Sequence, residues 1–295
     1  MTDAAGSLTR SEARRLGVTL LDSYLIAGGR RVPETLWDAR DLYRAMAAGQ
    51  RVSTAQASAF EKRQSYQSVA ARFDRVLYLT VGSVYTGNYA SACQWRAENA
   101  NDDRFTVVDT GAASGRLGLI VRLAAMAARQ GKGPEEVLAA ASRAIAACDE
   151  LLFLEQLRFL VAGGRLSRSK GFFGDLLGIK PVISPAAEGA VRAGSVRSAA
   201  EQVPFAVRRL QTRFSPDEAV TVLLQYSDNE ARVRGEIQPE IQERFPRARI
   251  EVSRLSLTSG AHMGPGTWGM AYCGELPSAG LGAVEKAPGS GSGHS

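Results

Sequence analysis

The first half of this 295-residue chain alternates strand patterns with helix patterns, and this alternation limits the possible folds more than any other feature. Apolar runs read as strands at 18–26, 75–81 and 105–110. Helical spacing of apolar residues follows at 38–48, 58–72, 88–100, 114–131 and 134–148. Strands that alternate with helices predict a parallel sheet covered on both faces. We therefore expect an N-terminal three-layer α/β/α domain over residues 1–149.

The second half has a different order of elements. Strand patterns occur at 151–155, 180–185, 190–198, 249–255 and in the run VTVLLQYS that begins at Val220. Two of them are separated only by a glycine turn, and helical segments are expected at 199–213 and 229–244. This order predicts a C-terminal α/β domain with a mixed sheet over residues 150–276. The tail, 277–295, is rich in Gly, Ser and Pro, and its composition predicts disorder.

Composition excludes several classes of protein. No apolar run is long enough to span a bilayer, and the N-terminus lacks the apolar stretch of a signal peptide. We expect a soluble, cytoplasmic protein without stable membrane insertion. The three cysteines have no CxxC spacing, which argues against a disulfide framework or a zinc site. The formal charge of +6 is spread over presumed helix faces, so no nucleic-acid partner is predicted, although basic residues are in excess at 165–197.

Four segments rich in glycine or hydroxyl residues are predicted to be loops at strand ends, where open α/β sheets bind ligands. They are STAQAS (53–58), GSVYTGNY (82–89), GGRLS (163–167) and AHMGPG (261–266). The last segment contains His262, the one histidine outside the tail. We interpret it as a loop of small residues that lets a ligand approach an imidazole.

Each segment also has a structural interpretation. Thr54 and Thr86 are each placed to be the N-cap of the following helix, and Gly163 to be a helix C-cap. A helix that starts at the TGN of 86–88 offers free N–H groups to an anion. Together the segments would gather hydroxyls, an imidazole and the guanidinium of Arg165 around a carboxylate or a phosphate.

The sequence gives no sign of bond-breaking chemistry. It contains no Walker loop, no GxGxxG fingerprint and no GxSxG elbow, and no nucleophile is paired with a base. No cluster has the spacing of metal ligands. We therefore predict no catalytic residues, no metal and no cofactor.

The order and content of these segments resemble the DegV family of fatty-acid-binding proteins. The resemblance extends from Thr2 to about Tyr272 and rests on these motifs: TDAAGSL, STAQAS, GSVYTGNYASA, VVDTGAASGRLG, LRFLVAGGRLS, LLGIKPVISPAAEGAVRAGSVRS and HMGPGTWGMAY.

The resemblance implies a two-domain fold that buries a long-chain fatty acid between its domains. By position, the carboxylate ligands would be Thr54, Thr86 with Gly87, and His262, with Arg165 supporting the same network. It also implies a separate ATP-dependent fatty acid kinase, to which the bound acid is presented for acyl-phosphate formation. The chain itself would then be a binding protein and not an enzyme.

The chain departs from the family motifs at several positions. TSQPS is TAQAS here, so Ala55 lacks a hydroxyl and Ala57 replaces proline, and SGTY is TGNY, with Asn88 in place of threonine. The family's first strand is expected ahead of the TDAAGSL segment, and the sheet would lack a strand without it.

Two other functions stay open at this point. One is a phosphotransferase of the dihydroxyacetone-kinase type, because those enzymes use a similar fold with a histidine. The other is a regulatory or interaction protein without a ligand, because several hydroxyls of the family motifs are missing.

Overall fold

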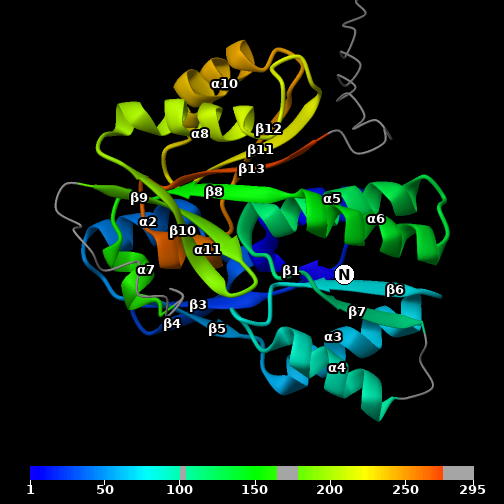
Figure 1. The fold of residues 1–295 in the computed structure, drawn as a ribbon. Coiled ribbons are helices and arrows are strands. Elements are labelled where there is room, and N and C mark those ends of the chain that lie inside the picture. Colours follow the sequence, from blue (N-terminus) through cyan, green and yellow to red (C-terminus); the bar gives the residue numbers. More distant parts are fainter. Residues whose placement is uncertain (100–103, 165–178, 275–295) are drawn as a thin grey trace, which may run out of the picture.

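The computed structural model describes residues 1–99, 104–164 and 179–274 of the chain. These residues form three sheets, with helices on the faces of the two larger ones (Figure 1). The predicted α/β fold with a parallel and a mixed sheet is confirmed. The division into domains at residue 149 stays a prediction, and the tail at 277–295 lies outside the described residues.

The first sheet is parallel and forms the middle layer of an α/β/α arrangement. Helices α3 (Ala59–Arg72) and α4 (Asn88–Glu98) cover one face, and α5 (Ser114–Arg129) and α6 (Pro134–Ala147) cover the other (Figure 1). In spatial order its strands are β2 (Leu20–Leu21), β1 (Thr2–Asp3), β6 (Val76–Thr80) and β7 (Phe105–Asp109). β1 lies within the TDAAGSL segment and not ahead of it, and it pairs with both β2 and β6.

The second sheet is mixed and follows in the second half of the chain. Only β11 and β12 are parallel neighbours, and the other pairs are antiparallel. Its order is β10 (Gly189–Val196), β9 (Lys180–Ala186), β8 (Asp149–Phe153), β13 (Trp268–Gly274), β11 (Val220–Tyr226) and β12 (Arg249–Arg254). The outer face carries η4 (Ala199–Glu201), α8 (Gln202–Gln211), α9 (Glu230–Arg232), the π-helical turn Val233–Ile237 and α10 (Gln238–Arg244).

A third, small sheet corrects two predictions. The run at 18–26 is not one strand, because the chain leaves β2 and begins β3 (Ser23–Ala27) after Asp22. The STAQAS segment is not a loop, because Val52–Gln56 is strand β5. β5 and β4 (Arg30–Pro33) both pair antiparallel with β3. The small and polar residues of β5 lack the apolar alternation by which a strand is recognised in a sequence.

Short helices complete the described fold. They are η1 (Ala4–Gly6), α1 (Arg10–Leu16), η2 (Glu34–Leu36), α2 (Ala39–Ala47), α7 (Arg158–Ala162) and α11 (Leu257–Met263). The capping box predicted for Thr9 and Glu12 at the start of α1 is present.

Helix α5 lies between the parallel and the mixed sheet and is buried on several sides. Leu117 and Ile120 are fully buried, in an apolar cluster that extends from Leu79 of β6 to Ala271 of β13. A helix that is apolar around most of its surface belongs in a core. The other face of the parallel sheet packs on an aromatic cluster in which Phe105 of β7 meets Trp95 of α4, with ring centroids 5.0 Å apart.

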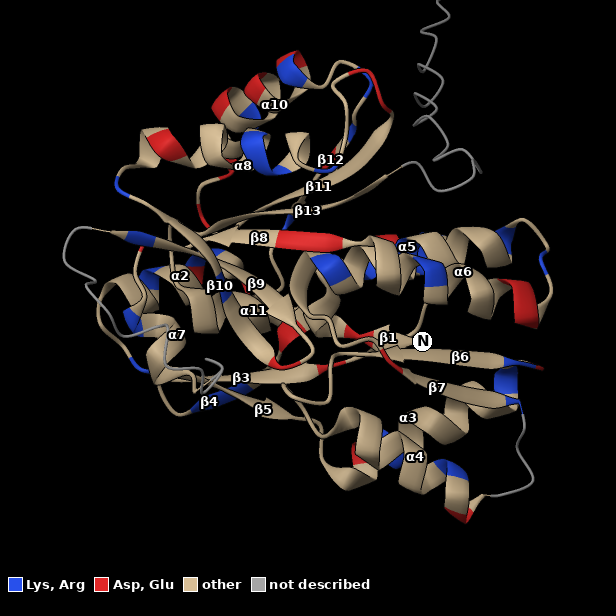
Figure 2. Cartoon of the chain, viewed as in Figure 1, with Lys and Arg blue, Asp and Glu red and all other residues tan. Residues whose placement is uncertain are grey.

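Charged residues are interspersed over the outer helices. Blue and red segments alternate along α10 (Figure 2), whereas the charged residues of α5 and α8 are all basic. This distribution agrees with the interpretation of the basic residues as solvated surface. Residues 165–178 of the basic stretch 165–197 lie outside the described residues.

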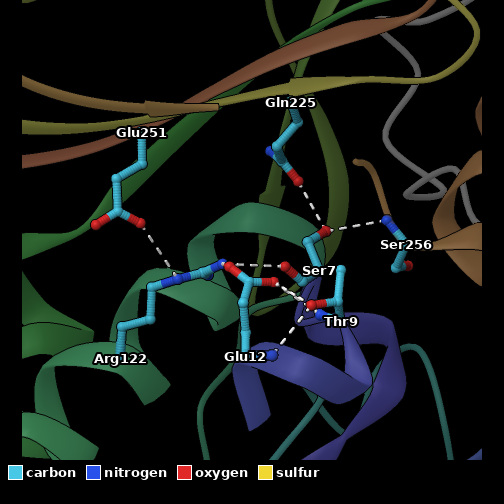
Figure 3. A network of polar contacts seen from close by, with 7 residues as sticks. All are labelled: Ser7, Thr9, Glu12, Arg122, Gln225, Glu251 and Ser256. Carbon is cyan, nitrogen blue, oxygen red and sulfur yellow. Dashed lines mark hydrogen bonds and ion pairs between the residues drawn. The ribbon is translucent and has the colours of Figure 1, made fainter. Parts of the chain in front are cut away.

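A polar network joins the two halves of the chain beside α5 (Figure 3). The Ser7 hydroxyl donates to Oε1 of Gln225 over 2.8 Å and accepts from the backbone N–H of Ser256 over 3.1 Å. The buried guanidinium of Arg122 donates to Oε1 of Glu12 over 2.8 Å and lies 3.7 Å from Oε2 of Glu251. Burial opposes ionisation of Glu12, but the Arg122 charge and hydrogen bonds outweigh it and lower the pKa of this carboxyl.

The carboxylate of Glu150, at the start of β8, accepts from the first free N–H groups of α5. Gly115 N donates to Oε1 over 3.0 Å and Arg116 N to Oε2 over 3.1 Å, while Gln225 Nε2 donates to Oε1 over 2.5 Å. The residue is completely buried, and this burial raises the pKa of Glu150 to about 7. Glu150 therefore caps the N-terminus of α5 from the mixed sheet, and this cap has the free-energy cost of burying a carboxyl group.

Removing the cation of the buried ion pair is expected to destabilise the fold strongly. Arg122→Met should lower the free energy of unfolding by about 3 kcal/mol, because Glu12 then keeps a partly buried charge without its partner. The double variant Arg122→Met/Glu12→Gln should recover part of this loss. Arg63→Met breaks an exposed ion pair with Glu98 and should cost less than about 1 kcal/mol in the same denaturant titration. Equal losses for the two arginines would contradict this assignment.

Glu150 should make stability depend on pH in a defined direction. The folded protein keeps the proton up to about pH 7, whereas the unfolded chain releases it near the ordinary glutamate pKa of 4.5. The free energy of unfolding should therefore fall as the pH rises from 4.5 to 7, by about 3 kcal/mol from this group. Glu150→Gln should show a smaller fall in urea titrations at several pH values. The exposed control Glu243→Gln should keep the wild-type dependence, and a Glu150 variant that also kept it would contradict the assignment.

Candidate functional site

A threonine and a histidine 208 positions apart in the sequence meet in a hydrogen bond. Oγ1 of Thr54 lies 3.0 Å from Nε2 of His262. Thr54 belongs to β5 and His262 to α11, so the pair joins the small sheet to the second half of the chain. The hydroxyl donates when Nε2 is unprotonated and accepts when Nε2 carries the proton, so the pair can adjust to either state of a ligand.

The structure corrects the predicted surroundings of both residues. His262 does not lie in a loop but in the last turn of α11, which is followed by Gly264 as its C-cap with a positive φ of 86°. Thr54 is not the N-cap of α3, because Ser58 forms the capping box with Glu61. Since Thr54 caps no helix, its hydroxyl is available to the imidazole.

A buried carboxylate fixes the start of the histidine helix. Oε1 of Glu34 accepts from Thr258 N over 3.1 Å, and Oε2 accepts from the Thr258 hydroxyl over 2.6 Å. Burial raises the pKa of Glu34, and the Thr258 hydrogen bonds partly offset this effect. Ser256 adds the N-cap, its hydroxyl accepting from Ser259 N. Two elements of the first half, η2 and β5, therefore hold α11 at its two ends.

Gly163 lies directly against the histidine ring. A Cβ atom at this position would be 2.2 Å from Nδ1 of His262, which is far inside van der Waals contact. Gly163 is the C-cap of α7, as predicted, but close approach is the feature that requires glycine there. A similar constraint applies at Gly260, where a Cβ would be 2.1 Å from the hydroxyl oxygen of Tyr43.

A cavity of about 390 Å³ opens at the Thr54–His262 pair. Among the described residues, its wall contains the cationic side chains of Arg51 and Arg158 and no Asp or Glu. The remaining lining is Met46, Gly49, Gln50, Val52, Ser53, Phe159, Ala162, Gly163 and Ala261. A mixture of apolar groups, donors and cations suits an anionic head group attached to an apolar body.

The Thr86–Gly87 segment does not line this cavity. Gly87 is the N-cap of α4, and the Thr86 hydroxyl accepts from Asn88 N over 3.3 Å. One of the backbone N–H groups that the sequence offered to an anion is thus already bonded within the segment. Asn88 in turn donates from Nδ2 to Asp3 over 3.0 Å.

Asp3 organises this segment, and sequence reasoning missed it. Its carboxylate also accepts from the hydroxyl of Tyr78 over 2.5 Å and from Val81 N over 2.7 Å. Burial raises the pKa of Asp3 to about 6, although these hydrogen bonds lower it. Asp3 could have been found in the sequence only by its place at the end of a strand, but a two-residue strand gives no hydrophobic pattern.

Gln56 connects the two parts of the predicted site. It follows Thr54 by two residues on β5, so both side chains leave the same face of the strand. A Cβ built on Gly87 would lie 3.5 Å from Oε1 of Gln56, and the same oxygen accepts from Nζ of Lys62 over 2.7 Å. The structure therefore brings Thr54, Gly163 and His262 together and places Gly87 beside the same strand. Arg165 lies outside the described residues.

The described residues contain neither a metal-binding cluster nor a membrane-spanning helix. No group of three or more His, Cys, Asp or Glu side chains among them could hold a metal ion. No helix within the described ranges is long and apolar enough to cross a membrane.

A comparison with known protein families shows to which family this chain belongs. The model of the DegV family, described as a family of uncharacterised proteins, matches residues 1–275. The chain belongs to the DegV family. A DegV domain-containing protein of Streptococcus pyogenes is 27% identical to it over 275 residues, which are 90% of this chain and 94% of that protein.

Solved structures of DegV proteins share the fold. A Thermus thermophilus DegV family protein whose structure is described for its fatty acid binding has a TM-score of 0.84 and 25% identity, covering 93% of this chain and 98% of that one. DegV of Bacillus subtilis, described as a fatty acid binding protein, has a TM-score of 0.82 over the same shares at 19% identity, which bears on the fold alone.

Adding one methyl group at Gly163 should disrupt the centre of this DegV site. In Gly163→Ala the new Cβ overlaps Nδ1 of His262, so the ring must turn and the 3.0 Å contact with Thr54 should break. Imidazole NMR resonances report this directly, because the chain has only two histidines and His294→Ala removes the other. The control Gly235→Ala meets nothing within 4 Å and should leave the spectrum unchanged. An unchanged His262 signal in Gly163→Ala would contradict the described packing.

Proposed function

We propose that this DegV family chain binds a long-chain fatty acid between its two predicted domains. The observation that carries the proposal is the Thr54–His262 hydrogen bond, because it joins residue 54 of the first half to residue 262 of the second at the wall of a cavity. The hydroxyl and the imidazole are the two groups that would bind the carboxylate. The family relationship and the fatty acid binding of the Thermus thermophilus protein support this assignment.

The remaining predicted ligands extend the same head-group site. Thr86 and Gly87 would reach the carboxylate from the segment that lies against Gln56, and the Thr86 hydroxyl can donate to the ligand while it accepts from Asn88 N. Arg165 would supply a cation by its position in the GGR motif.

The acyl tail would provide most of the affinity and the head group the orientation. Each buried CH₂ contributes about 0.8 kcal/mol, so a long chain outweighs a few hydrogen bonds. A hydrogen bond to a charged group contributes about 1.5 kcal/mol. Substitution at the head group should therefore weaken binding modestly and disturb the position of the carboxylate more.

The finer proposal is presentation of the carboxylate to a separate ATP-dependent kinase in the cytoplasm. The sequence contains no Walker phosphate loop, so the chain would need such a partner to form an acyl phosphate. Arg51 and Arg158 line the cavity beside Thr54 and His262, where their charges would favour both the acid and a phosphorylated product.

Lipid extraction is the first test of binding. Mass spectrometry of the denatured, purified protein should find a fatty acid in stoichiometric amount. Thr54→Val should weaken binding about tenfold through loss of one charge-assisted hydrogen bond, and Thr54→Ser should stay near wild type. A folded protein that yields no lipid and takes up none when it is added would refute the proposal.

His262 separates binding from presentation. His262→Ala should reduce the rate of a coupled kinase assay much more than it reduces fatty acid affinity, because the tail contacts remain while the carboxylate loses its orientation. His294→Ala is the matched control and should alter neither quantity. Equal losses in the two assays for His262→Ala would show that the histidine acts only in binding.

A further inference from the structure

Two of the three cysteines face each other across neighbouring strands. Strands β8 and β13 are antiparallel, and their register pairs Tyr272 with Asp149 and Ala271 with Glu150. Continuing this register by one residue places Cys273 opposite Cys148. The backbone of Cys148 permits this continuation, because its φ of −77° and ψ of 140° are extended although it also ends α6.

Both side chains lie on the same face of this strand pair. They belong to one buried apolar cluster beside α5, and their exposed fractions are 3% for Cys148 and 0% for Cys273. Each thiol shifts the pKa of the other. The sequence argues against a disulfide framework, because these two cysteines are 125 positions apart and no spacing motif marks them.

This arrangement satisfies the geometric requirement of a disulfide. Directly opposed residues of antiparallel strands have Cα atoms about 4.5–5.5 Å apart. Disulfides join Cα atoms separated by about 4.4–6.8 Å. The expected backbone separation is therefore compatible with a bond between the two sulfur atoms.

The thiols also differ in acidity. The hydrogen bond from Cys148 and the nearby charge of Arg213 lower the pKa of Cys273, and the same hydrogen bond together with burial raises the pKa of Cys148. A thiolate is the nucleophile in thiol oxidation. Cys273 is thus the sulfur that would react first, and Cys148 the sulfur that would resolve the product.

We propose that Cys148 and Cys273 are a modification site at which a two-electron oxidant of the peroxide class forms an intramolecular disulfide. The Cys273 sulfur attacks a peroxide oxygen, giving a sulfenic acid and one water molecule from hydrogen peroxide. The Cys148 sulfur then attacks the sulfenic sulfur, its proton leaves with the hydroxide as a second water molecule, and the S–S bond forms. Two thiols are oxidised by two electrons, and one peroxide is reduced to two waters.

The disulfide would link β8 and β13 covalently, and these strands are connected to the two elements that contain Gly163 and His262. β8 leads into the segment with α7 and Gly163, and β13 follows directly after α11 with His262. The cysteines lie at the opposite end of both strands, so the Thr54–His262 contact should persist. The disulfide closes a long loop in the unfolded chain, and the melting temperature should rise by about 5 °C.

The test uses the full chain with Cys93→Ala, which leaves only the two cysteines of interest. The folded protein is treated with hydrogen peroxide, denatured and alkylated, and its intact mass is measured. We expect a loss of two hydrogens, no alkylated thiol, a peptide that links Cys148 to Cys273, and reversal of both mass and melting temperature by dithiothreitol.

Matched variants exclude other products. Cys93→Ala/Cys148→Ala and Cys93→Ala/Cys273→Ala should show no loss of two hydrogens and no rise in melting temperature under the same treatment. The result from the Cys93→Ala protein stands by itself if either double variant fails to fold. Two free thiols after treatment, sulfinic acids on separate cysteines, or covalent dimers would each overturn the proposal.

Discussion

The arrangement of this protein depends on how helix α5 is held between two sheets. Its apolar sides pack on β6 of the parallel sheet and β13 of the mixed sheet, while its free N–H groups are satisfied by Glu150 from β8. Gln225 donates to the same carboxylate and accepts from Ser7, so strands of the mixed sheet and the N-terminal segment share one polar network. A buried carboxylate is tolerated only with such donors, and the partners of Glu150 come from distant parts of the sequence. The two halves of the chain are therefore fixed relative to each other by a requirement for hydrogen bonds as well as by apolar contact.

This fixed relation makes the candidate site possible. Thr54 and His262 can meet because β5 and α11 lie side by side, and Glu34 ties the start of α11 to the first half of the chain. Glycine at position 163 leaves room for the imidazole, and glycine at 260 leaves room for Tyr43. The site is a product of close backbone approach, in which small residues are required by their neighbours. The same mixed sheet brings Cys148 opposite Cys273 at the far ends of β8 and β13, so one strand pair links a proposed ligand site to a proposed redox site.

Sequence reasoning succeeded where a residue pattern has a local physical cause. Helix α3 was predicted at 58–72 and begins at Ala59 after a capping box, and β9 and β10 flank the predicted glycine turn. It failed where tertiary contacts determine the conformation. The polar strand β5 exists because it pairs with β3, and His262 is helical because Glu34 and Ser256 cap a short helix that would not persist alone. Asp3 and Glu34 were overlooked because a buried carboxylate is recognised by its partners, which lie 75 or more positions away.

The sequence by itself determined the α/β class, the parallel direction of the strands in the first sheet, the mixed second sheet and the family. These features follow from alternating elements and ordered motifs, which are properties of a linear chain. It also singled out Thr54 and His262 as residues of interest. Only the tertiary structure decided that these two side chains are 3.0 Å apart, that Gly163 is required by an imidazole, and that Thr86 bonds to its own helix. It likewise decided that two cysteines without a motif are neighbours. Distances of this kind depend on strand register and helix packing, which arise from contacts between segments far apart in the chain.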